Sequence, residues 1–175
     1  MDKTAIEHWS PVIGGQFWWT GLIFVLIFVP LMIFFGNKIS SKQRDVVLYG
    51  MGIYQLGNKA LTQIGYIFSD NYIMASNLPL HLCGLSGILA GIVVFYRKQI
   101  LFEFLYFFGL VGFIHSVLTP EFTGGVSSWK IFDYYVGHSM LIIIPVWLMK
   151  YYEFRLRHRA WWTSFIYLQL IVVLV

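Results

Sequence analysis

Long apolar runs separated by short basic segments constrain this sequence most strongly. Five runs of about 18 to 23 residues have the length required to cross roughly 30 Å of hydrocarbon as a helix. A sixth run is shorter and reaches Val175 without a polar flank, so either it is a short span or the natural chain continues. The expected spans are residues 16–36, 46–68, 78–96, 100–118, 133–150 and 160–175.

The composition agrees with a membrane location. The chain is 58% hydrophobic and only 11% charged, which is too apolar for a soluble domain of 175 residues. Tyr and Trp flank several runs, as they do at membrane interfaces. We therefore expect an all-α, polytopic helical bundle of six transmembrane helices. Residues 1–175 would form a single domain in the cell membrane.

The basic residues indicate the orientation of this bundle. Nine of the 12 lie in alternate connections, those after the first, third and fifth runs. Because cytoplasmic loops are enriched in lysine and arginine, these connections should face the cytoplasm and the N-terminus should lie outside. The nine residues are Lys38, Lys42, Arg44, Arg97, Lys98, Lys150, Arg155, Arg157 and Arg159. Glu103 should lie at the same interface, near Arg97 and Lys98.

Three histidines and the single cysteine lie inside the apolar runs, where ionisable groups are costly and rarely without a task. With the predicted orientation and a rise of about 1.5 Å per residue, Cys83 and His138 lie about 7 Å below the outer ends of their spans. His115 lies about 5 Å deep by the same count, and His81 is shallower than Cys83. All four should occupy the outer third of the membrane.

The second run adds a polar stripe at steps of three and four residues, which is one face of a helix. Such a face should line the bundle interior or a wet cavity. Lys59 lies too far from the inner end for easy snorkelling, so we expect it to line the cavity and meet an anionic group. The stripe contains Gln55, Asn58, Lys59, Thr62, Gln63 and Tyr66.

Small residues indicate where helices approach closely. Gly87 and Gly91 form one small-xxx-small pair, and Gly112 and Ser116 form another. Cys83 lies one turn before Gly87, so its side chain should face a neighbouring helix. His81 lies about 200° around the same helix from Cys83, which makes Cys83 the better candidate for the cavity.

Each of these residues could also have a structural role without any function in chemistry. A buried cysteine is often a small packing residue. His81 could cap its helix or lie at the interface, and His115 could bond a carbonyl of the next helix. Nearby histidines at matched depth favour a thiol nucleophile with a base for Cys83.

Three motifs give the sequence a family resemblance. They are Leu78-Pro79-Leu80-His81-Leu82-Cys83, Leu118-Thr119-Pro120-Glu121 and Gly137-His138-Ser139. These motifs resemble the YwaF-like integral membrane proteins of bacteria, over roughly residues 45–150. That family looks distantly similar to the vertebrate transmembrane protein 164 acyltransferase. Around His138 the two small residues are exchanged relative to the usual family order.

The resemblance implies that Cys83 is a nucleophile and His138 its base. The expected reaction is phospholipid acyl transfer, or acyl hydrolysis, near the outer leaflet. His115 would orient His138 or contact the ester, Asn58 or Gln63 would donate to the oxyanion, and Lys59 would hold the lipid phosphate. His81 would line the substrate site.

Two other functions remain open. The four His and Cys residues form a ligand set suited to zinc or copper. Alternatively, the polar stripe could line the path of a carrier or a small-ligand binding site, although no inverted repeat is apparent. The acyl-transfer reading requires no cofactor. Its partners would be membrane phospholipids or lysophospholipids, and the sequence contains no nucleic-acid signature.

Overall fold

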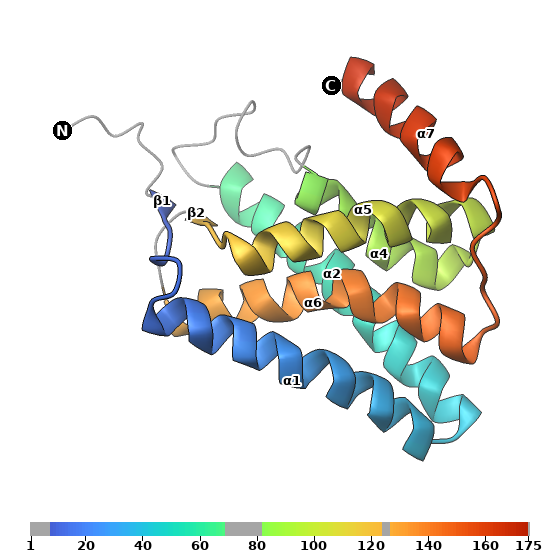
Figure 1. Ribbon diagram of the computed structural model, residues 1–175, viewed down its shortest axis with the longest axis horizontal. Helices are drawn as coiled ribbons and strands as arrows, with labels where there is room; N and C mark the ends of the chain where they lie inside the picture. The colour runs from blue at the N-terminus through green and yellow to red at the C-terminus, as the bar shows by residue number, and fades with distance from the viewer. Residues whose placement is uncertain (1–7, 69–81, 124–126, 175) are drawn as a thin grey trace.

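The computed structural model describes residues 8–68, 82–123 and 127–174, which form six helices and a short strand pair (Figure 1). The strands pair antiparallel, with His8 opposite Thr123 and Trp9 opposite Phe122. The all-α prediction is therefore confirmed. The elements are β1 (His8–Trp9), α1 (Gln16–Lys38), α2 (Ser41–Ile67), α4 (Leu82–Tyr96), α5 (Gln99–Leu118), β2 (Phe122–Thr123), α6 (Ser128–Tyr151) and α7 (Ala160–Leu174).

Two helices, α2 and α6, begin where a side chain caps them rather than where hydropathy rises. Ser40 and Gln43 form a capping box, so α2 starts five residues before the predicted span. Ser127 accepts a hydrogen bond from the Lys130 backbone N–H at 3.2 Å, and α6 also starts five residues early. Hydropathy locates the apolar part of each helix and misses these polar first turns.

The connections α1–α2, α4–α5 and α6–α7 lie together at one end of the bundle, to the right in Figure 1. Asp45 at the start of α2 accepts hydrogen bonds from Arg97 at 3.0 Å and from Tyr152 at 2.7 Å. Three segments that are distant in sequence are thus joined by one carboxylate. We call this the basic end. The clustering of these three connections supports the prediction that alternate connections lie at the same end of the bundle. Which side of the membrane this end faces stays a prediction.

The other end carries the strand pair, and we call it the strand end. The Trp18 indole N–H donates to the Leu118 carbonyl at 2.8 Å, which joins the start of α1 to the end of α5. Trp9 packs on Phe122 with 5.5 Å between ring centroids. Cys83, near the start of α4, and His138, in the first half of α6, belong to this half of the bundle.

The core forms around α6, which packs against α1, α2, α4 and α5. Trp147 is its largest fully buried side chain. By contrast, α1 exposes large apolar residues along its length, including Ile23, Leu26 and Leu31. Exposed apolar surface of this extent is typical of lipid contact.

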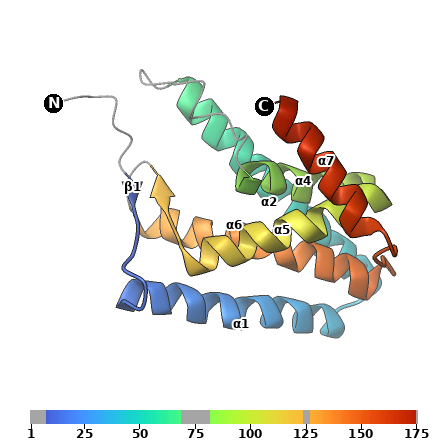
Figure 2. The ribbon, with the colours of Figure 1, turned by 45° about the horizontal axis from the view of Figure 1, so that its top comes forward.

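Three of the described helices, α1, α5 and α6, are long and apolar enough to cross a membrane. Residues Cys83–Tyr96 form a shorter apolar helix. Figure 2 shows α7 inclined away from the rest of the bundle. It packs against α5, and its small residues Ala160 and Ser164 are buried one turn apart. The crossing of six spans stays a prediction.

Candidate functional site

The half-buried Cys83 thiol faces α5 rather than the outside of the bundle. Its Sγ lies 4.0 Å from the Gly112 carbonyl oxygen. A Cβ added to Gly112 would lie 3.6 Å from this sulfur, which is ordinary van der Waals contact, so α4 and α5 pack together at the thiol. This contact agrees with the small-residue spacing around Cys83 and Gly112.

Lys59 of α2 brings a positive charge to the thiol. It interacts electrostatically with both Cys83 and Asp133. Its stem crosses Gly87, one turn after Cys83, where an added Cβ would lie 2.9 Å from Lys59 Cε. Gly87 therefore provides the space that the lysine stem occupies between α2 and α4.

Asp133 is the centre of the polar contacts between α2 and α6. Its Oδ1 accepts a hydrogen bond from the Tyr54 hydroxyl at 2.5 Å. The Asn58 amide nitrogen lies 2.8 Å from both carboxylate oxygens. One turn along, the Gln55 amide donates to the Gly137 carbonyl at 2.8 Å. The polar stripe of α2 thus faces α6 over this stretch.

His138 lies against Tyr134, one turn earlier on α6. The two ring centroids are 4.2 Å apart. The Tyr134 hydroxyl donates to the Ser116 carbonyl at 3.1 Å, which fixes the tyrosine against α5. Tyr134 also lies within electrostatic range of Cys83. The predicted nucleophile and the predicted base therefore share Tyr134 as a neighbour.

The backbone determines which His138 nitrogen carries the proton. Nδ1 lies 2.7 Å from the Tyr134 carbonyl oxygen, which can only accept a hydrogen bond. Nδ1 must therefore be the donor in this contact. In the neutral ring the lone pair is then on Nε2, which is the form that a general base requires.

The remaining predicted site residues are His115, Gln63, Asn58 and His81. His115 is exposed on α5, and its Nδ1 lies 3.4 Å from Thr119 Oγ1, one turn further along the same helix. Gln63 is half-buried on α2, one turn beyond Lys59. The Asn58 amide nitrogen is engaged by Asp133. His81 lies outside the described residues.

The metal hypothesis depends on groups of ligands at short distances. Within residues 8–68, 82–123 and 127–174, no three His, Cys, Asp or Glu side chains are grouped to hold a metal ion. Because His81 belongs to the proposed ligand set and is not described, this finding covers only part of that set.

Sequence reasoning missed Asp133, Tyr134 and Tyr54 as parts of the site. Asp133 is the first residue of the predicted span 133–150, whereas α6 begins at Ser128 and places it within the helix. A helical signal was available, because Tyr54 and Asn58 are four residues apart and contact the same carboxylate. Tyr134 and His138 have the same spacing on α6.

Glu103 also differs from its expected role as an interface residue near Arg97 and Lys98. It is 1% exposed and pairs with Arg157, whose Nη2 lies 2.7 Å from Oε2. Arg97 instead pairs with Asp45. The acid lies one turn inside α5, so the segment after α6 must fold over it to supply the arginine.

Comparison with known proteins identifies the family. A model of the TMEM164 family matches residues 7–175. The chain belongs to the TMEM164 family. No curated protein and no solved structure matches it. Membership in this membrane-protein family, together with the three long apolar helices, establishes an integral membrane protein. The candidate active site of this TMEM164-family protein is formed by Cys83, Lys59, Tyr134 and His138.

Proposed function

We propose that this TMEM164-family protein transfers acyl chains between phospholipids and lysophospholipids through a thioester on Cys83. The observation that carries the proposal is the orientation of His138. Its Nδ1 is committed to the Tyr134 carbonyl at 2.7 Å, so Nε2 is the basic nitrogen. A thiol nucleophile in an apolar environment requires such a base or a neighbouring cation.

Lys59 supplies the cation. Its electrostatic contact with Cys83 favours the negative charge that develops on sulfur. The same ammonium group can attract the phosphate of a lipid whose ester lies at the thiol. Asp133, held by Tyr54 and Asn58, keeps a compensating charge near Lys59.

The reaction divides into two balanced steps. His138 Nε2 takes the thiol proton, and the thiolate attacks the carbonyl carbon of the acyl ester. The ester C–O bond breaks, the leaving alcohol takes the proton from the imidazolium, and the acyl chain remains as a thioester. The hydroxyl of a lysophospholipid then attacks the thioester with His138 again as base. The new ester C–O bond forms as the C–S bond breaks, and the leaving thiolate takes the proton back from the imidazolium; water in place of the alcohol gives hydrolysis.

The contacts of α2 favour this reaction over a carrier. Gln55 and Asn58 bond directly to α6 and so join the two helices. A solute path would require these amides to face an open channel. His115 lies one turn from Gly112 on α5, where it would contact the lipid ester or headgroup rather than orient His138.

The proposal also includes the number of spans and the orientation of the protein in the membrane. Six spans with the N-terminus outside would place Cys83 and His138 near the outer leaflet, and the YwaF-like motifs indicate a bacterial cytoplasmic membrane. The substrates would then be outer-leaflet phospholipids. The cavity that admits them would lie between α2, α4 and α6.

The test is acyl exchange by purified protein in nanodiscs that contain labelled phospholipid and lysophospholipid. Cys83→Ser should abolish transfer and the thioester that hydroxylamine releases. His138→Gln should lower the transfer rate by about 10²- to 10⁴-fold, as expected for loss of a general base. Gly57→Ala, on α2 where an added Cβ meets open space, is the matched control. Parental turnover in both site variants would rule out this mechanism.

A further inference from the structure

The segment between α6 and α7, residues 152–159, carries three arginines at alternate positions, and we call it the strap. Arg157 anchors it. Its Nε lies 2.9 Å and 3.1 Å from the two Glu103 oxygens, and its backbone N–H donates to Glu103 Oε1 at 3.1 Å. Gln99 adds a bond to the same carboxylate at 2.7 Å and another to the Arg155 carbonyl. The strap is therefore fixed on the end of α5.

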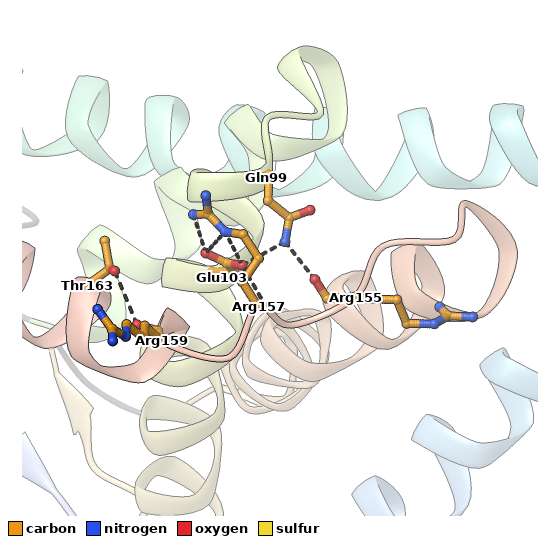
Figure 3. Close-up of polar contacts among 6 residues, drawn as sticks. All are labelled: Gln99, Glu103, Arg155, Arg157, Arg159 and Thr163. Carbon is orange, nitrogen blue, oxygen red and sulfur yellow. Dashed lines mark hydrogen bonds and ion pairs between the residues drawn. The ribbon is translucent and has the colours of Figure 1, made fainter.

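The guanidinium groups of Arg155 and Arg159, on either side of Arg157, do not pair with Glu103. Figure 3 shows the Arg157 guanidinium turned onto Glu103 and the Arg155 side chain extending away from it. Arg155 and Arg159 are both exposed. Arg155 Nη1 donates to the Met149 and Phe154 carbonyls, which leaves other N–H groups of its guanidinium for a ligand. Arg159 contributes only its backbone carbonyl to the Thr163 hydroxyl bond in this view.

The acidic groups of the basic end are largely occupied by internal pairs. Asp45 pairs with Arg97, and Glu103 pairs with Arg157. Glu153, which is exposed, is the third acid of this end. The exposed lysines and arginines therefore leave a positive surface around the strap. They are Lys38, Lys42, Lys98, Lys150, Arg155 and Arg159.

The position of this surface indicates which anion it meets. Trp161 and Trp162 follow the strap directly and are exposed, as aromatic residues are at membrane interfaces. The helices that end here, α1 and α6, are apolar enough to cross a membrane. The surface therefore lies at headgroup level, where the available anions are lipid phosphates, and arginine binds phosphate with two parallel hydrogen bonds.

We propose that the strap binds the headgroups of anionic phospholipids through Arg155 and Arg159, while Arg157 holds the strap in place. Neighbouring arginines of one segment thus have opposite roles, two toward lipid and one toward the protein. This site is at the opposite end of the bundle from Cys83 and is independent of the proposed acyl transfer.

The experiment measures lipid binding to the delipidated, detergent-solubilised full chain by native mass spectrometry, with phosphatidylglycerol and phosphatidylcholine as probes. Arg159→Gln should weaken phosphatidylglycerol binding by about fivefold, and the double variant with Arg155→Gln by about 25-fold. Phosphatidylcholine binding and the melting temperature of Arg159→Gln should stay at parental values, because its side chain is exposed. Inorganic phosphate at millimolar concentration should not compete.

The matched control is Lys130→Gln, which removes an exposed charge at the strand end of α6. It should leave phosphatidylglycerol binding unchanged. Parental affinity in both Arg159→Gln and the double variant would overturn the proposal. An equal loss in Lys130→Gln would also overturn it, because binding would then follow net charge and not the strap. Competition by inorganic phosphate would also overturn the proposal, because the strap would then bind free anions rather than lipid headgroups.

Discussion

Single residues at the candidate site are each held by a specific neighbour. Tyr134 fixes the His138 ring by a tilted ring contact and through its own carbonyl. Gly87 is small where the Lys59 stem needs room. The proposed chemistry of the thiol would therefore depend on residues that take no direct part in the reaction.

Gly87→Ala tests this dependence. The added Cβ would lie 2.9 Å from Lys59 Cε, so the flexible lysine stem would have to shift, and we expect this to carry the ammonium group away from the thiol. A shift of about 1 Å weakens the attraction between the charges, so alkylation of Cys83 by iodoacetamide should slow by roughly two- to threefold. Gly57→Ala, which meets open space, should react at the parental rate. An unchanged rate in Gly87→Ala would show that Lys59 does not act on the thiol.

At the scale of helices, α2 is joined to its neighbours in two different ways. Toward α4 it packs closely, because a Cβ at Gly91 would lie 3.2 Å from the Gly52 carbonyl and would overlap Leu56. Toward α6 it makes hydrogen bonds through Tyr54, Gln55 and Asn58. Packing sets the distance between the helices, and the polar contacts set their register.

A double-mutant cycle measures the second kind of contact. Asn58→Ala and Asp133→Ala should each destabilise the bundle in SDS-induced unfolding, since each leaves a half-buried partner with fewer hydrogen bonds. We expect a coupling energy of about 1 to 2 kcal/mol, because the amide meets both oxygens of one carboxylate. Leu61→Ala is the control, since its side chain is exposed on the same helix. Additive effects of Asn58→Ala and Asp133→Ala would contradict the contact.

At the scale of the molecule, the basic end holds three connections together through two ion pairs and one tyrosine. Hydrogen bonds from Tyr152 and Arg97 lower the pKa of Asp45. Burial and the bond to Asp45 raise the pKa of Tyr152 to about 12. Arg97 stacks on Tyr152 with its guanidinium carbon 4.6 Å from the ring centroid. Loss of this cluster should therefore separate α2, α4 and α6 at one end.

The raised pKa of Tyr152 predicts a loss of stability at high pH. Between pH 10 and about 12, Tyr152 ionises in the unfolded chain while it stays protonated in the folded one. The unfolded state therefore binds fewer protons, and stability falls as pH rises through this range. The melting temperature of the parent should decrease more steeply above pH 10 than that of Tyr152→Phe, which keeps the ring over Arg97. Identical pH profiles would show that this tyrosine is not buried in the folded protein.

The helices were predictable because their signal is local. Runs of apolar residues act within one or two turns, and Cys83 could be assigned to a helix contact from the spacing of Gly87 and Gly91, whereas the capped first turns after Ser40 and Ser127 were missed. The candidate site was only partly predictable. Cys83, His138 and Lys59 were singled out because such groups are unusual in apolar runs, whereas tyrosine is common there and only its four-residue spacing from His138 pointed to Tyr134.

The sequence alone determined the all-helical class, the approximate span of each helix and the separation of basic connections from the others. The reason is that hydrocarbon selects apolar length, and both length and charge are read along the chain. Only the tertiary structure decided that Asp133 joins α2 to α6, that Glu103 takes Arg157, and that Tyr134 orients His138. These pairs depend on how each helix is rotated and where it crosses its neighbour, which side-chain packing between distant segments fixes.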